Sequence, residues 1–98
     1  MQYIVTVELP DEMTMEFMTL VPSHRARINK MMQRGLMLSY SLNMERTRLW
    51  MIFNVKEAEE VERILHSLPL HAHFLSYDIQ LLMFHNATSG ALPSISLN

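Results

Sequence analysis

The sequence predicts a one-domain α+β protein in which a four-stranded antiparallel sheet carries two helices on one of its faces. Four stretches alternate apolar and polar residues with a period of two, which is typical of half-buried strands. Two other stretches repeat apolar residues every three or four positions, as amphipathic helices do. These elements follow one another as strand, helix, hairpin, helix and strand. A chain of 98 residues has room for one hydrophobic core built in this way.

The first strand and the first helix are predicted within residues 2–35. Alternation predicts a strand over 2–9, and Pro10 ends it because proline cannot donate to the ladder. A helix then begins at Thr14 and ends at Gly35. Pro22 lies inside this stretch and lacks a backbone donor, so we expect either a kink there or a main helix that starts at Pro22. The apolar stripe of the helix comprises Phe17, Leu20, Val21, His24, Ile28, Met31 and Met32.

A hairpin is predicted next, followed by a second helix and a last strand. Two alternating runs, 36–44 and 48–55, are joined by the short polar turn 45–47. Glutamates gather at the start of the helix expected over 57–68, where the positive end of the helix dipole stabilises them. Pro69 ends that helix, and alternation resumes over 72–84.

The order of elements is the ferredoxin-like βαββαβ arrangement, which leaves one face of the sheet without helices. That face is too apolar to contact only water, so we expect a second copy of the chain to stack on it. Its apolar members are Ile4, Met37, Trp50, Ile52 and Phe74. The two sheets would enclose a cavity with a polar lining of Thr6, Ser39, Ser41, Asn43, Asn54, Ser76 and Asp78. Trp50 suits either stacking on a planar ligand or burial in the dimer interface, and Phe74 is expected as a further ligand contact.

Composition excludes several functional classes. A net charge of -2 without a basic stripe argues against nucleic acid and against an anionic membrane surface as partners. There is no cysteine for a disulfide or a thiolate metal site, and no apolar run of about 20 residues that would span a membrane. We expect a cytoplasmic protein with a barrel domain over residues 1–86 and an arm or disordered tail over 87–98, where periodicity is lost.

Five short segments and their spacing carry a resemblance to a known family. They are Val7-Glu8-Leu9-Pro10, Gln33-Arg34-Gly35, Phe53-x-Val55, Leu68-Pro69-Leu70 and His85. Over residues 2–86 the chain resembles the muconolactone isomerases and, more broadly, the dimeric α+β barrel proteins. The resemblance implies a cofactor-free enzyme that shifts a ring double bond of a small lactone by proton transfer, in a homo-oligomer. This chain differs from the family on the second strand, where the family carries aromatic and basic residues and this chain has Met37, Ser39 and Ser41.

Proton transfer next to a carbonyl needs a base with a suitable pKa, and His24 is the leading candidate. It lies on the apolar stripe of the first helix, and the Pro-x-His pattern at 22–24 is similar to one in another branch of the barrel superfamily. There, a histidine is proposed to act with an aspartate of the sheet. Asp78 is the only acid expected within the last three strands, so His24 and Asp78 form the predicted catalytic pair. The alternative is a hydrogen-bonded core histidine and a solvating charge on a strand.

Other functions remain open on the sequence. His71 and His73 would share one face of a strand and could bind a metal only with a third ligand, for which no motif is visible. A barrel that binds a small cyclic organic ligand without catalysis, or that serves in assembly, is one alternative to the isomerase. A cofactor-free monooxygenase of the same superfamily is another. An RNA-recognition domain shares the order of elements but requires an aromatic and basic sheet signature that this sequence lacks.

Overall fold

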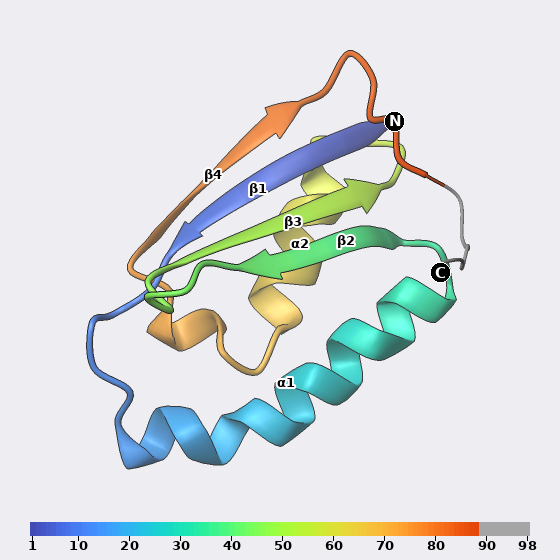
Figure 1. Ribbon diagram of the computed structural model, residues 1–98. Helices are drawn as coiled ribbons and strands as arrows, with labels where there is room; N and C mark the ends of the chain where they lie inside the picture. Colours follow the sequence, from blue (N-terminus) through green and yellow to red (C-terminus); the bar gives the residue numbers. More distant parts are fainter. Residues whose placement is uncertain (89–98) are drawn as a thin grey trace, which may run out of the picture.

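The computed structural model describes residues 1–88. Its elements are β1 (Gln2–Glu8), α1 (Met15–Gln33), β2 (Met37–Leu42), β3 (Arg48–Asn54), α2 (Ala58–Ser67), the 3-10 helix η1 (His71–His73) and β4 (Ser76–Leu81). The strands form one sheet in the order β2-β3-β1-β4, and each pair of neighbours is antiparallel (Figure 1). The predicted βαββαβ fold is therefore confirmed. The tail expected over 87–98 falls almost wholly on residues 89–98, which lie outside the described residues.

Both ends of α1 are set by the residues that the sequence indicates. The Thr14 hydroxyl caps the N-terminus by accepting the N–H of Phe17 at 3.1 Å. Gly35, with φ of 75°, follows the C-terminus in the left-handed conformation that glycine adopts most easily. The helix runs from Met15 through Pro22 without a break, so the alternative in which it starts at Pro22 is wrong. No helix within residues 1–88 is both long and apolar enough to cross a membrane.

The core lies between the sheet and the two helices, all on one face. Residues at alternate positions of β1 and β3 point toward the helices, and the buried stripes of α1 and α2 cover them. This single cluster includes Val5, Val7, Leu49, Met51 and Phe53 from the strands, with Ile28 and Met31 from α1 and Val61 and Leu65 from α2. The opposite face of the sheet carries no helix, as predicted.

Two side chains expected on the open face lie on the core side instead. In β2 the pairing with β3 shifts between Met37 and Ser39, and this irregularity turns Met37 into the core, where it is 1% exposed. The last strand begins at Ser76 rather than near residue 72, because residues 71–73 form η1. Phe74 caps that 3-10 helix and packs against the core. The open face is therefore less apolar than the sequence predicts, with Ile4, Trp50 and Ile52 remaining.

Candidate functional site

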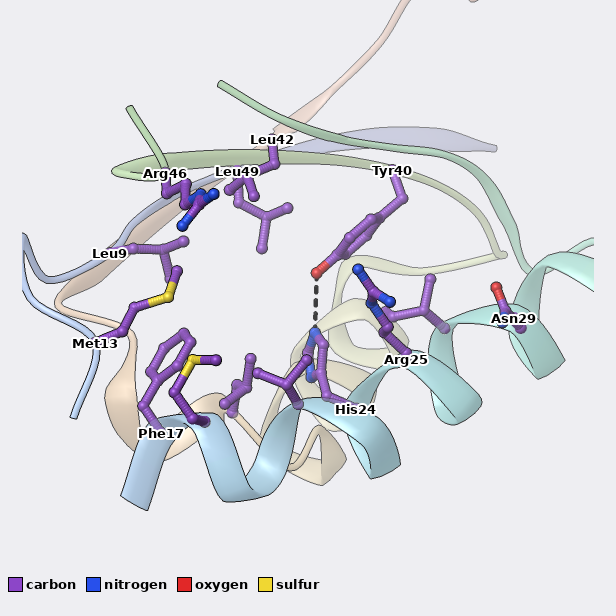
Figure 2. A pocket seen from close by; sticks show the side chains of 14 residues that line it. Leu9, Met13, Phe17, His24, Arg25, Asn29, Tyr40, Leu42, Arg46 and Leu49 are labelled. Atoms are coloured by element: carbon purple, nitrogen blue, oxygen red, sulfur yellow. Dashed lines mark hydrogen bonds between the residues drawn. The ribbon is translucent and has the colours of Figure 1, made fainter. Parts of the chain in front are cut away.

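A cavity of about 600 Å³ opens between α1 and the hairpin of β2 and β3, on the helix-covered side of the sheet (Figure 2). This volume lies in the range of small-molecule sites, which are mostly apolar with a few polar groups. The apolar walls are Leu9, Met13, Phe17, Met18, Val21, Ile28, Leu42, Leu49 and Leu70. The polar side chains of the lining are His24, Arg25, Asn29, Tyr40 and Arg46.

The His24 side chain reaches the cavity because it lies on the buried stripe of α1. Phe17, His24, Ile28 and Met31 follow at steps of three, four and seven residues, so they share the face that packs on the sheet. His24 is 2% exposed, and its Nε2 atom lies 3.0 Å from the phenol oxygen of Tyr40. Figure 2 shows the two side chains approaching one another from α1 and β2.

Tyr40 points toward the helices because of the register of β2. It is the Cα partner of Met51, a fully buried core residue, and partners in an antiparallel pair point to the same face. The ring is half-buried, so its hydroxyl has little access to solvent and finds a partner in His24 instead. The hydrogen bond therefore joins two residues 16 positions apart along the chain.

Burial keeps both members of this pair neutral at pH 7. Desolvation lowers the pKa of His24 to about 4, because the charged imidazolium loses its hydration. Desolvation likewise raises the pKa of Tyr40 to about 12, and the nearby positive charge of Arg25 partly opposes that shift. In this neutral pair, the tautomer of His24 decides whether the phenol donates to Nε2 or accepts its proton.

The second ring nitrogen of His24 has no hydrogen-bond partner among the described residues. Nδ1 is buried, and each neutral tautomer leaves it with either an unused lone pair or an unused N–H. Buried polar atoms of this kind are uncommon and destabilise the fold when they are left unpaired. Together with the perturbed pKa values, this marks the His24–Tyr40 pair as a candidate functional site.

Two arginines give the cavity a positive character. Arg25 lies beside the His24–Tyr40 pair, whereas Arg46 lies at the other end of the lining, close to Leu9 and Leu49 (Figure 2). Within the part of the chain that the structure describes, no acidic side chain lines the cavity and neither arginine takes part in a salt bridge. The site therefore suits a ligand with negative charge, or one that develops negative charge in a reaction.

The family model of muconolactone delta-isomerase matches residues 1–88 of this chain. The chain belongs to the muconolactone delta-isomerase family. No curated protein sequence matches it.

Two solved structures share the fold of this muconolactone delta-isomerase family member. A muconolactone isomerase superposes with a TM-score of 0.71 at 17% identity, over 93% of this chain and 97% of the other. A 5-chloro-2-hydroxyhydroquinone dehydrochlorinase from Burkholderia phenoliruptrix AC1100, in complex with 2,5-dihydroxybenzoquinone, gives a TM-score of 0.72 at 9% identity. That alignment covers 87% of this chain and 96% of the other. At these identities the likeness concerns the fold.

Four of the predicted site residues form one row across the open face of this chain's sheet. Ser41 pairs with Trp50, Trp50 with Thr6, and Thr6 with Asp78. This row faces away from His24, because Thr6 alternates with the buried Val5 and Val7. Asp78 is exposed and accepts a hydrogen bond from Gln80 at 3.0 Å. Within a single copy of this protein, the sheet therefore separates His24 from Asp78.

The remaining predicted ligand contacts lie apart from one another. Ser39 and Asn54 are on the open face, and Ser76 is exposed at the start of β4. Asn43 lies in the β2–β3 turn, where its Oδ1 accepts the N–H groups of Thr47 and Arg48, both at 2.9 Å. Of all the predicted site residues, His24 is the one that lines the cavity of the described chain.

Tyr40, Arg25 and Arg46 line the cavity but are not among the site residues predicted from the sequence. The signal for Tyr40 was present: its hydroxyl stands on the apolar row of the second strand, which faces the helix carrying His24. Arg25 adjoins His24 in sequence. Arg46 lies in the predicted polar turn 45–47, but only the structure shows that it lines the cavity.

The two histidines weighed as metal ligands do not share a face of a strand. His71 packs against His66, with ring centroids 4.4 Å apart, whereas His73 meets the edge of Phe17 at 5.4 Å. They diverge because η1 replaces the start of the expected strand. Within residues 1–88, no group of three histidine, cysteine or acidic side chains is placed to hold a metal ion.

Proposed function

We propose that the protein is an isomerase that moves a ring double bond of a small lactone by proton transfer, with His24 as the proton carrier. The observation that carries this proposal is the 3.0 Å contact between His24 Nε2 and the Tyr40 hydroxyl in the cavity wall. Membership of the muconolactone delta-isomerase family supports it. The solved relatives are named an isomerase and a dehydrochlorinase, and double-bond migration and elimination of HCl can both proceed by removal of a proton from carbon.

In the proposed reaction His24 and Tyr40 act as one proton-carrying unit. The Tyr40 oxygen removes a proton from the carbon next to the lactone double bond while its own proton passes to His24 Nε2. The C–H electron pair moves into the ring and onto the carbonyl oxygen as a dienolate. Return of the proton to a different carbon, with Tyr40 recovering its proton from His24, completes the shift. The overall change is redox-neutral.

The cavity provides two aids to this transfer. The positive charge of Arg25, beside the pair, stabilises both a transient phenolate on Tyr40 and the dienolate. The pKa of about 4 for His24 belongs to the free site, where an imidazolium would have no ionic partner. A dienolate in the cavity supplies that partner, so His24 becomes more basic as the negative charge develops.

Proton exchange in heavy water tests this proposal. We expect the wild-type protein to incorporate deuterium into butenolide-type lactones, and His24→Gln and Tyr40→Phe each to lose most of that exchange. Both replacements retain much of the original volume, and circular dichroism checks their fold. Asp78→Asn is the matched control on the opposite face, and it should exchange at the wild-type rate.

The possible results separate the candidate roles. Loss of exchange in Asp78→Asn but not in Tyr40→Phe would replace Tyr40 by the predicted aspartate, contributed from another chain. Wild-type exchange in both His24→Gln and Tyr40→Phe would reject the pair. If the wild type exchanges no lactone, the protein is better described as a barrel that binds a small ligand.

We also propose that the protein forms a homo-oligomer through the open face of its sheet. Ile4, Trp50 and Ile52 lie side by side on β1 and β3 without a covering helix. Ile52 is already 9% exposed in the single chain, and a second copy would bury the half-buried Ile4 and Trp50 beside it. It would also bring the row of Ser41, Thr6 and Asp78 into an interface between the two sheets. The predicted contacts of these polar residues with a ligand belong to that assembly.

A further inference from the structure

We infer that Met13 and Met18 make the cavity sensitive to oxidation: when a peroxide converts their thioethers to sulfoxides, a ring binds in the cavity less tightly. Both side chains belong to the cavity lining, Met13 just before α1 and Met18 in the first turn of that helix. The inference concerns the cavity as a binding site. It therefore goes beyond the proton transfer proposed above and does not depend on it.

The chain has ten methionines, all within residues 1–88, and the structure places them in three environments. Met31, Met37 and Met51 lie in the core and are 5%, 1% and 0% exposed. Met13 and Met18 combine a place in the cavity lining with access to solvent, since Met13 is half-buried and Met18 is 49% exposed. The other five are exposed and stand outside that lining: Met1, Met15, Met32, Met44 and Met83.

The two thioethers belong to an apolar part of the cavity wall. Figure 2 shows Met13 at the end of the cavity where Leu9 and Phe17 also lie, and both of these neighbours are buried. Thioether side chains are flexible and polarizable, so they adapt to a ring that packs against them. The proposed stacking of a second copy uses the opposite face of the sheet, so it leaves Met13 and Met18 accessible to a small oxidant.

Oxidation of a thioether by hydrogen peroxide is a balanced two-electron step. A lone pair of the sulfur attacks one peroxide oxygen, the O–O bond breaks, and the hydroxide that leaves takes up the proton of the transferred oxygen as water. The sulfur is oxidised to a sulfoxide and the peroxide is reduced. The side chain gains no charge, but it becomes polar. A ring that packs on it must displace water from the new oxygen, so binding weakens.

Peptide mass spectrometry and calorimetry after peroxide treatment test the inference. The binding probe is coumarin, a neutral aromatic lactone, so its affinity reports contact with the cavity wall rather than attraction to the arginines. We expect dilute hydrogen peroxide to oxidise Met13 and Met18 together with the exposed methionines and to spare the three in the core. Coumarin affinity should then fall roughly tenfold.

Paired variants assign the effect to the cavity wall. Met13→Leu with Met18→Leu retains apolar volume without sulfur, so peroxide should leave the coumarin affinity of this double variant unchanged. Met15→Leu with Met44→Leu is the matched control, because it removes two thioethers outside the lining, and peroxide should weaken its binding as in the wild type. Met13→Gln with Met18→Gln introduces polar groups of similar length, so it should bind weakly before any oxidation. Circular dichroism checks each fold.

Several results would overturn the inference. Wild-type protein that keeps its coumarin affinity after both cavity methionines are oxidised is one, and an equal loss of affinity in the leucine double variant is another. A loss that appears only when core methionines are oxidised would assign the effect to unfolding. Undiminished binding by the glutamine variant, or no binding by the untreated wild type, would also overturn it. Failure of lactone exchange with the peroxide effect intact would refute the proposed reaction alone.

Discussion

The phenol oxygen of Tyr40 lies 3.0 Å from Nε2 of the buried His24, although the two residues come from different elements on opposite sides of the cavity. The pair is the most chemically distinctive feature of the described chain. It joins a base kept neutral by burial to a hydroxyl whose pKa is raised to about 12.

The stability of the protein should fall as the pH is lowered from 6.5 to about 4, because of His24. In the unfolded chain His24 has its ordinary pKa of 6.5, so it binds a proton in this window, whereas the folded protein binds one only near pH 4. The stabilisation is complete above pH 6.5 and decreases by about 3 kcal/mol through the window. Urea denaturation at several pH values, with His24→Gln as the comparison, measures it. An equal fall in the variant would contradict the assignment to His24.

The rate of lactone exchange should be insensitive to pH between about 6 and 8, because His24 is already neutral there. At lower pH, kcat/KM should fall with a midpoint near the pKa of about 4 rather than near 6.5. The measurement is a pH profile at low substrate concentration. A midpoint between 6 and 7 would indicate an ordinary exposed histidine as the base, and would exclude the buried His24 from that role.

Gly35→Ala should lower the free energy of unfolding by about 1 kcal/mol. The φ of 75° at this position is unfavourable for alanine, while the added methyl group meets no atom within 4 Å, so the effect comes from the backbone alone. Chemical denaturation measures it. Wild-type stability in the variant would mean that residue 35 does not need a positive φ at the end of α1.

Trp50→Asp and Ile52→Asp should dissociate the proposed homo-oligomer. Each places a charge on the open face, where a stacked sheet would have to bury it without a partner. Sedimentation at micromolar concentration is expected to show an oligomer for the wild type and a monomer for the double variant. Lys56→Asp is the control: it also introduces an aspartate, but at an exposed position after β3, so this variant should stay assembled. A monomeric wild type would refute the proposal directly.

The sequence by itself determined the elements, their order and the fold. Strand alternation and helical stripes follow from residue spacing, and the ends of α1 follow from the local chemistry of Thr14 and Gly35. It also identified His24 as a polar residue on a buried stripe. These features depend on residues close together along the chain, so a linear pattern is enough to predict them.

Only the tertiary structure decided on which side of the sheet the cavity lies and which groups meet there. The partner of His24 proved to be Tyr40 rather than Asp78, because the pairing of β1 with β4 directs Asp78 to the opposite face. The shift in β2 that buries Met37 breaks the alternation from which the open face was predicted. Each of these outcomes depends on how distant segments align, and a displacement of one residue in a strand reverses the direction of its side chains.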